Sequence, residues 1–236
     1  MPTKRNLKRA RTGVWLVLFV LQLASCQSEQ EVTGRIAFIS FRDGNTDIYV
    51  IDAGGHNEIQ LTSDPNDDYS PTWSPDGEQI AFVSNRNGNR DIYVLSVDGT
   101  HLTQLTHSSS QDYRPAWSPD GERIAFISDR NGSDEVCLMN ADGTDKDCCP
   151  ASNPNPLSFN ELAWSPDSKH LAYTSVHDIE DCEPSQFGSS CSYNAVSIID
   201  ADTMEQIQLT DLAFNKTAAS PTWSSTGHWR KRPLTA

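Results

Sequence analysis

Basic residues and long apolar runs are both scarce in this sequence. It holds 18 Lys and Arg against 32 Asp and Glu, a formal net charge of −14. A body so acidic is repelled by nucleic acid, so we expect no nucleic-acid partner. The apolar run at residues 14–21 is too short to span a bilayer as a helix. No stretch of eleven or more residues within the repeats described below has helical periodicity, which favours an all-β fold.

Catalytic and metal-binding motifs are also lacking. The sequence contains neither G-x-S-x-G nor H-E-x-x-H, and its six histidines fall at unrelated positions in the repeats. Asp43, Asn45 and Asp47 have the spacing of the start of a calcium loop, but the required Gly and Glu do not follow. The sequence therefore predicts no catalysis, no metal and no cofactor.

What the sequence does contain is a repeat. Residues 115–132, P-A-W-S-P-D-G-E-R-I-A-F-I-S-D-R-N-G, nearly reproduce residues 71–88, which lie 44 positions earlier. A weaker copy carries Trp164, and a further start carries Trp223. A period in the forties indicates one supersecondary unit that must stack on its neighbours to bury its apolar face.

Each unit reads as four short strands. S-P-D-G at 118–121 is a turn, because Pro presets the backbone and Gly accepts the left-handed conformation. Residues 124–128 are rich in β-branched and aromatic residues, and Asn131-Gly132 is a hairpin signal. A third strand at 135–139, a turn at Asp142-Gly143 and a fourth strand ending near Cys149 complete the unit. Four antiparallel strands in about 44 residues match a propeller blade.

The copies agree in spacing. Each Trp lies seven residues before the first apolar residue of the second strand, at 73 and 80, 117 and 124, and 164 and 171. This spacing predicts blades near 34–62, 71–106, 115–150 and 162–210. The fold class expected is therefore all-β, a β-propeller of about four four-stranded antiparallel blades.

The repeated motifs W-S-P-D-G, I-A-F-x-S-x-R-x-G and D-I-Y-V resemble the TolB-like β-propeller repeats, which are related to the WD-repeat propellers. The resemblance covers about residues 34–224 and implies the fold, whereas propellers of this type serve many functions. Propellers resembling TolB usually have six blades. The resemblance thus leaves open a small four-bladed ring or a chain truncated from a six-bladed one.

Blade one begins without its Trp strand. Residues 220–224, S-P-T-W-S, are predicted to supply that strand and close the ring; without it, Ile36 and Phe38 would be exposed on an open edge. Beyond this segment, residues 225–236 form an irregular basic tail, because Arg230-Lys-Arg stands where an apolar triplet is expected.

The first 33 residues lie outside the predicted propeller. Residues 1–25 have a basic start, an apolar middle and the ending L-A-S before Cys26, which resembles the signal and lipobox of a bacterial lipoprotein. The resemblance implies that Cys26 carries the lipid and that residues 26–33 are a tether. An ordinary cleaved signal and, more remotely, a eukaryotic secreted protein are the alternatives. Removal of residues 1–25 leaves 13 basic against 32 acidic residues, or −19, so membrane attachment would depend on acyl chains.

The loops entering the Trp strands are the candidate binding site. In propellers resembling this one, they surround the mouth of the central channel, where acidic and aromatic residues would suit a basic or polar peptide. The candidate residues are Asp68, Tyr69, Asp112, Tyr113, Asn160 and Glu161. The alternative is structural, with each Asp capping a turn and each Tyr packed between blades.

Five cysteines remain after Cys26. A two-residue turn at Asp142-Gly143 would place Cys137 opposite Cys148, within reach of a disulfide. Cys149 aligns with a core Leu of blade two and is expected to stay a thiol. Cys182 and Cys191 lie in one 13-residue insertion of blade four and are predicted to bridge.

These features favour a non-catalytic, exported and membrane-anchored envelope lipoprotein that binds a protein or peptide partner at its channel mouth. Two alternatives stay open: a sugar-binding or metal-dependent lyase-type module that uses the channel, and a truncated fragment without a function.

Overall fold

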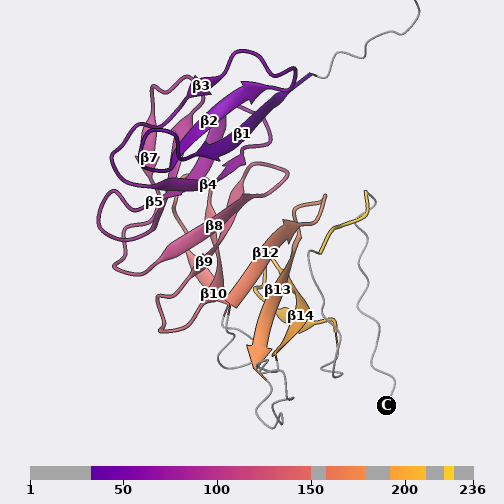
Figure 1. Cartoon of the computed structure of the whole chain (residues 1–236). Helices are drawn as coiled ribbons and strands as arrows, with labels where there is room; N and C mark the ends of the chain where they lie inside the picture. Colours follow the sequence, from indigo (N-terminus) through magenta and orange to yellow (C-terminus); the bar gives the residue numbers. More distant parts are fainter. Residues whose placement is uncertain (1–32, 150–157, 179–191, 211–220, 226–236) are drawn as a thin grey trace, which may run out of the picture.

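A computed structural model describes residues 33–149, 158–178, 192–210 and 221–225 (Figure 1). Within these ranges the chain forms fifteen β-strands in four antiparallel sheets and contains no helix. The prediction of an all-β propeller built from four-stranded antiparallel blades is confirmed. No helix in these ranges is long and apolar enough to cross a membrane.

Each sheet is one blade, and its strands follow the order of the chain. Blade one contains β1 (Arg35–Ser40), β2 (Asp47–Asp52) and β3 (Ile59–Gln60). Blade two contains β4 (Asp68–Trp73), β5 (Gln79–Ser84), β6 (Asp91–Ser96) and β7 (Leu102–Gln104). Blade three contains β8 (Asp112–Trp117), β9 (Arg123–Ser128), β10 (Glu135–Asn140) and β11 (Asp147–Cys149). Blade four contains β12 (Ser158–Trp164), β13 (His170–Asp178), β14 (Ser192–Asp200) and β15 (Gln206–Gln208). Blades two to four thus begin a few residues before the predicted points, because their first strands start at Asp68, Asp112 and Ser158.

The S-P-D-G turns set the register between first and second strands. The Ser74 hydroxyl accepts a hydrogen bond from the backbone N–H of Gln79 at 2.9 Å, and Ser118 accepts the same bond from Arg123 at 2.9 Å. Gly121 has a φ of 77°, a left-handed conformation that a side chain would strain. Trp73 consequently pairs with Ile80, Trp117 with Ile124 and Trp164 with Leu171.

The hydrophobic core lies between the blades. One cluster joins Ile48 of blade one to Phe82 and Tyr93 of blade two. Further clusters join blade two to blade three and blade three to blade four. Each blade therefore buries its apolar faces against its neighbours, as expected for a repeat architecture.

Residues 221–225 do not form the closing strand that the sequence predicts. They have no strand structure, and Trp223 donates from Nε1 to the carbonyl of Ala163 in blade four at 2.8 Å. Trp164 makes the same bond to the carbonyl of Ala116 in blade three at 3.0 Å. The prediction was wrong because Trp223 packs on the blade before it, as Trp164 does, and β1 has β2 as its single strand partner among the described residues.

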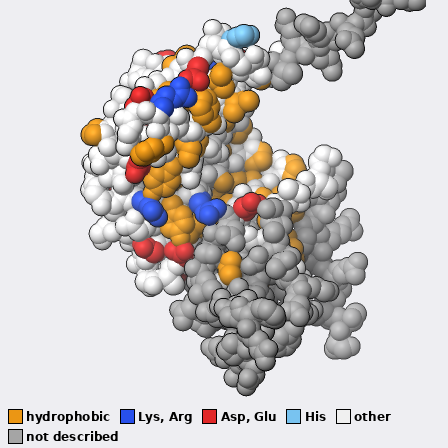
Figure 2. All heavy atoms as spheres, viewed as in Figure 1, with side chains coloured by type: hydrophobic (Ala, Val, Ile, Leu, Met, Phe, Trp, Pro, Cys, Tyr) orange, Lys and Arg blue, Asp and Glu red, His pale blue; other side chains and the backbone are white. Residues whose placement is uncertain are grey.

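Blade one consequently has an open edge. On β1, Ile36 is 52% exposed, as predicted, and Ile39 is 50% exposed, whereas Phe38, which was also predicted to be exposed, is half-buried and stacks on Tyr49 of β2. Hydrophobic side chains reach the surface in the upper part of the molecule, where β1 lies (Figure 2).

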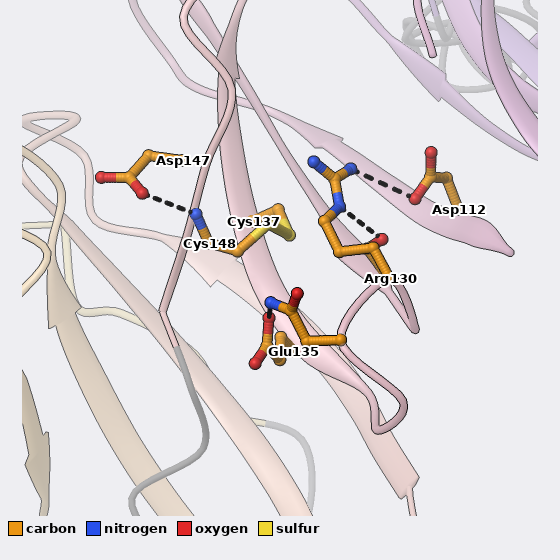
Figure 3. Close-up of a disulfide and its surroundings, with 8 residues drawn as sticks. Asp112, Arg130, Glu135, Cys137, Asp147 and Cys148 are labelled. Carbon is orange, nitrogen blue, oxygen red and sulfur yellow. Dashed lines mark hydrogen bonds and ion pairs between the residues drawn. A yellow bond between two sulfur atoms is a disulfide. The ribbon is translucent and has the colours of Figure 1, made fainter. Parts of the chain in front are cut away.

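The cysteines of blade three follow the register of its last hairpin. Cys137 of β10 lies opposite Cys148 of β11, and the two form a disulfide (Figure 3). Cys149 is buried, and burial raises the pKa of its thiol, which donates towards the Met204 carbonyl at 3.4 Å. Cys26, Cys182, Cys191, the predicted signal and the basic tail lie outside the described residues and remain predictions.

Candidate functional site

The loops that were predicted to surround the channel mouth lie at one end of the blades, which we call the loop end. Because the strands alternate in direction, the loop before each first strand lies at the same end as the turn between second and third strands. Asn45 Nδ2 donates to the carbonyl of Asp64 at 2.8 Å, and Asn89 Nδ2 donates to the carbonyl of Ser110 at 2.7 Å. The motifs D-G-N at 43–45 and N-G-N at 87–89 therefore link the turn between the second and third strands of one blade to the loop before the first strand of the next blade. In the described ranges no group of three His, Cys, Asp or Glu side chains is placed to hold a metal ion.

Asp68 lies at the start of β4, but its carboxylate is fully buried. Arg86 donates through Nη2 to both oxygens of Asp68, at 3.0 and 2.9 Å. Arg86 Nε also donates to the hydroxyl of Ser84 at 2.8 Å, which holds the guanidinium in place. Burial raises the pKa of Asp68 above its ordinary value, although hydrogen bonds and the nearby Arg86 charge oppose the shift.

Blade three repeats the arrangement with Asp112 and Arg130. Asp112 is fully buried, and Arg130 Nη2 donates to its Oδ1 at 3.4 Å, while Arg130 Nε donates to the Ser128 hydroxyl at 2.9 Å. Figure 3 shows this pair in the same view as the Cys137–Cys148 disulfide. The acid and the arginine are thus a structural pair that recurs at the same positions of two blades.

The prediction that Asp68 and Asp112 present an acidic rim to a partner is wrong, because both carboxylates are buried against arginine. The tyrosines are packed as well. Tyr69 contacts the core between blades two and three, with the Arg90 guanidinium 5.6 Å from its ring centroid. Tyr113 packs against two core clusters, and burial, followed by its hydrogen bond to Asp134, raises its pKa. The structural alternative thus describes the two tyrosines, which pack between blades, whereas the two aspartates pair with an arginine of their own blade.

The exposed side chains of the first strands lie at a bulge instead. Pairing shifts by one residue between Tyr69 and Thr72 and between Tyr113 and Ala116. Within these bulges Ser70 has a φ of 54° and Arg114 a φ of 55°, and both residues are exposed. A left-handed conformation costs a residue other than glycine roughly 1–2 kcal/mol, so the same strain recurs in two blades.

Blade four has its own register shift, between Phe159 and Leu162, and Glu161 occupies the position of Ser70 and Arg114. Glu161 is exposed, whereas Asn160 belongs to β12 but its side chain lies outside the described residues. β4 packs against β8 and β8 against β12, so the bulges of successive blades follow one another. Together they offer a hydroxyl, a cation and a carboxylate to solvent.

Ser70 and Arg114 were missed by the sequence reasoning, although a signal was present. Pro71 and Pro115 stand inside these strands, and proline has no N–H to donate to a neighbouring strand. A proline within a strand therefore predicts a bulge, and a bulge re-aims the side chain beside it.

An open groove of about 380 Å³ lies between blades one and two. Leu61, Leu95 and Leu102 line its apolar side, while Asp64 and Arg86 line its polar side. A groove of this composition can accept an apolar side chain of a bound peptide beside a polar group.

Comparison with known proteins identifies the blades. Residues 34–181 match the family described as the TolB beta propeller domain. A segment of 47 residues, 20% of this chain, is 43% identical to the Tol-Pal system protein TolB of Geobacter sulfurreducens and covers 11% of that protein. A putative TolB from Agrobacterium tumefaciens has a similar fold, with a TM-score of 0.61 and 24% identity over 82% of this chain and 67% of that chain. TolB from Acinetobacter baumannii gives a TM-score of 0.61 and 23% identity over 82% of this chain and 45% of that chain.

Proposed function

Because this chain belongs to the family of TolB β-propeller domains, we propose that it is a non-catalytic envelope protein that binds a protein or peptide partner. The binding surface would be the loop end of the blades, around the bulge residues Ser70, Arg114 and Glu161. The strained backbone that exposes Ser70 and Arg114 at equivalent positions carries the proposal, since strain of this kind gathers at functional sites. The similar protein of Geobacter sulfurreducens is named as a protein of the Tol-Pal system, which favours a protein partner.

The surface at this end is of mixed charge rather than acidic. The acids nearest the first strands are paired with arginine, and the bulges carry Arg114 as well as Glu161. We therefore narrow the basic or polar peptide expected from the sequence to a partner that carries charged groups of both signs. No arrangement of side chains in the described ranges specifically favours a sugar-binding or lyase-type module.

Site-specific photocrosslinking tests the binding face. A photoreactive amino acid at exposed Ser109, in the loop before β8, is expected to give a discrete adduct in living cells. The same amino acid at exposed Glu122, at the opposite end of blade three, is the matched control and should give none. Adducts of equal yield from both positions, or an adduct from Glu122 alone, would show that the loop end is not the binding face.

We further propose that the protein is exported and held at the membrane through Cys26. The L-A-S-C ending and the acidic remainder, −19 by 13 basic minus 32 acidic residues, support an acyl anchor rather than electrostatic attachment. Cys26→Ala is expected to move the protein from the membrane fraction to the soluble fraction and to abolish labelling by a fatty-acid analogue. An unlabelled wild-type protein in the soluble fraction would contradict the anchor without affecting the binding proposal.

A further inference from the structure

β1, β5, β9 and β13 are equivalent strands, and each begins with a residue that lies beside the tryptophan of the next copy of the repeat. These first residues are Arg35, Gln79, Arg123 and His170. Two of them are cations and the histidine becomes one when it is protonated, whereas Gln79 carries no charge. The junction between blades two and three is therefore the exception among the four.

Arg123 shows what this position holds between blades three and four. Its guanidinium carbon lies over the ring of Trp164, 5.5 Å from the centroid. Nη1 donates to the carbonyl of Ala201, and Nη2 donates to the carbonyl of Ser168, both at 2.8 Å. Nη1 also donates to the carboxylate of Asp202 at 3.0 Å. One ring face, two carbonyls and one carboxylate together hold the guanidinium group.

Arg35 repeats part of this arrangement between blades one and two. Its guanidinium carbon lies over the ring of Trp73, 5.2 Å from the centroid, and Nη2 donates to the carbonyl of Gly77 at 3.3 Å. Gly77 and Ser168 are equivalent, since each follows the tryptophan of its blade by four residues. Because two junctions place a guanidinium group over this ring and beside this carbonyl, the repeat itself builds a guanidinium site.

Between blades two and three the same site is open. Gln79 is exposed, whereas Arg123 at the equivalent position is half-buried. A crevice of about 180 Å³ lies beside Gln79, and Trp117, Gly121 and Ala141 are among the residues that line it. These three occupy the positions of the ring and of the two carbonyl-bearing residues that hold Arg123. The chain thus keeps the groups that bind a guanidinium but does not supply the guanidinium.

The crevice is also acidic. Asp76 lines it from blade two and Asp120 lines it from blade three. Hydrogen bonds from the Ser74 hydroxyl and from the backbone N–H of Glu78 lower the pKa of Asp76, which is therefore ionised at neutral pH. No lysine or arginine is found among the described residues that line the crevice. Acidic walls beside an aromatic ring favour a cation.

We propose that this crevice binds a small molecule that carries a guanidinium group on a short alkyl chain. The guanidinium plane lies against the ring of Trp117 and donates to the carbonyls of Gly121 and Ala141. A planar, weakly hydrated guanidinium stacks on an aromatic ring and bonds to two acceptors at once, which an ammonium group does less well. The crevice lies at the end of the blades opposite the loop end, so the inference goes beyond the proposed function and does not rest on it.

Butylguanidinium is the probe, and butylammonium, which has the same charge and the same alkyl chain, is its control. Each is titrated into the full chain while the indole N–H signals are followed by NMR, with the signal of Trp117 assigned through Trp117→Phe. We expect a saturable shift of the Trp117 signal with butylguanidinium, with a dissociation constant on the order of a millimolar. Butylammonium should bind roughly tenfold more weakly.

Gln79→Arg fills the crevice with a side chain of the protein itself. The affinity for butylguanidinium should fall at least roughly tenfold, because the new guanidinium takes the place that Arg123 takes at the next junction. A urea midpoint no lower than that of the wild type would show that the variant is folded. Thr103→Arg adds the same charge at an exposed position of β7, and Gln79→Ala leaves the crevice open, so both should keep nearly the wild-type affinity.

Three results would overturn the proposal: no binding to the wild type, equal affinity for the two probes, or unchanged affinity in folded Gln79→Arg. A protein adduct from a photoreactive amino acid at Glu122 that Gln79→Arg abolishes would assign the crevice to an arginine of a protein and overturn the small ligand. Crosslinking from Ser109 should be unaffected by Gln79→Arg, so failure of this proposal and failure of the loop-end proposal can be recognised separately.

Discussion

Arg86→Met is expected to lower the free energy of unfolding by about 3–5 kcal/mol, because it leaves the Asp68 carboxylate buried without its cation. Asp68 is fully buried, and its charge is offset by a hydrogen bond from the Ser84 hydroxyl and by the two hydrogen bonds and the positive charge of Arg86. Methionine keeps much of the apolar stem, which limits the change to the charged group. Urea denaturation of the full chain measures the effect through the shift in midpoint at constant slope.

Arg42→Met is the matched control for this experiment. Arg42 occupies the same repeat position and bonds to the corresponding serine, but it pairs with an exposed glutamate. Exposed ion pairs contribute little to stability, so Arg42→Met should lower the free energy of unfolding far less than Arg86→Met. If Arg86→Met and Arg42→Met lowered the free energy of unfolding equally, burial of Asp68 would not determine the cost of removing its arginine.

The loss in Arg86→Met should also depend on pH. Burial already raises the pKa of Asp68 in the folded protein, and removal of the nearby cation raises it further. A carboxyl group whose pKa is higher in the folded than in the unfolded protein favours the folded state at low pH, and this advantage is lost as the pH rises through the folded pKa. The difference between variant and wild type should therefore narrow as the pH falls towards the ordinary aspartate range. A difference that stays constant down to pH 4 would contradict this account.

The register of the blades could be predicted because local chemistry sets it. Ser-Pro-Asp-Gly closes a turn through its own side chains and backbone, so the spacing from Trp117 to Ile124 determines their pairing without distant information. The hairpin that brings Cys137 opposite Cys148 follows from its turn in the same way.

The burial of Asp68 could not be read from the same spacing. Its pairing with Ser84, and so its approach to Arg86, depends on the one-residue shift at the bulge beside Pro71. Extrapolation of the register from Trp73 alone would place Asp68 opposite a different residue. The acid therefore looked like a free loop residue, whereas the bulge turns it inward and exposes Ser70 instead.

The position of Trp223 depended on packing between blades, which strand spacing does not describe. The indole of Trp164 donates to the carbonyl of Ala116, the residue just before the tryptophan of the preceding blade, whereas Nε1 of Trp73 and Nε1 of Trp117 make no hydrogen bond within the described residues. Trp223 finds that carbonyl at Ala163. The segment at 221–225 therefore packs on blade four through Trp223 without forming a strand.

Ile124→Ala is expected to lower the free energy of unfolding by about 2–5 kcal/mol, because Ile124 is fully buried in the core between blades two and three. Ile36→Ala makes the same change in the same hexapeptide, so intrinsic strand propensity cancels between the two variants. Ile36 is half exposed, and its loss should stay below about 1 kcal/mol. Denaturation with urea compares the two directly, and equal losses would mean that β1 is already covered in solution.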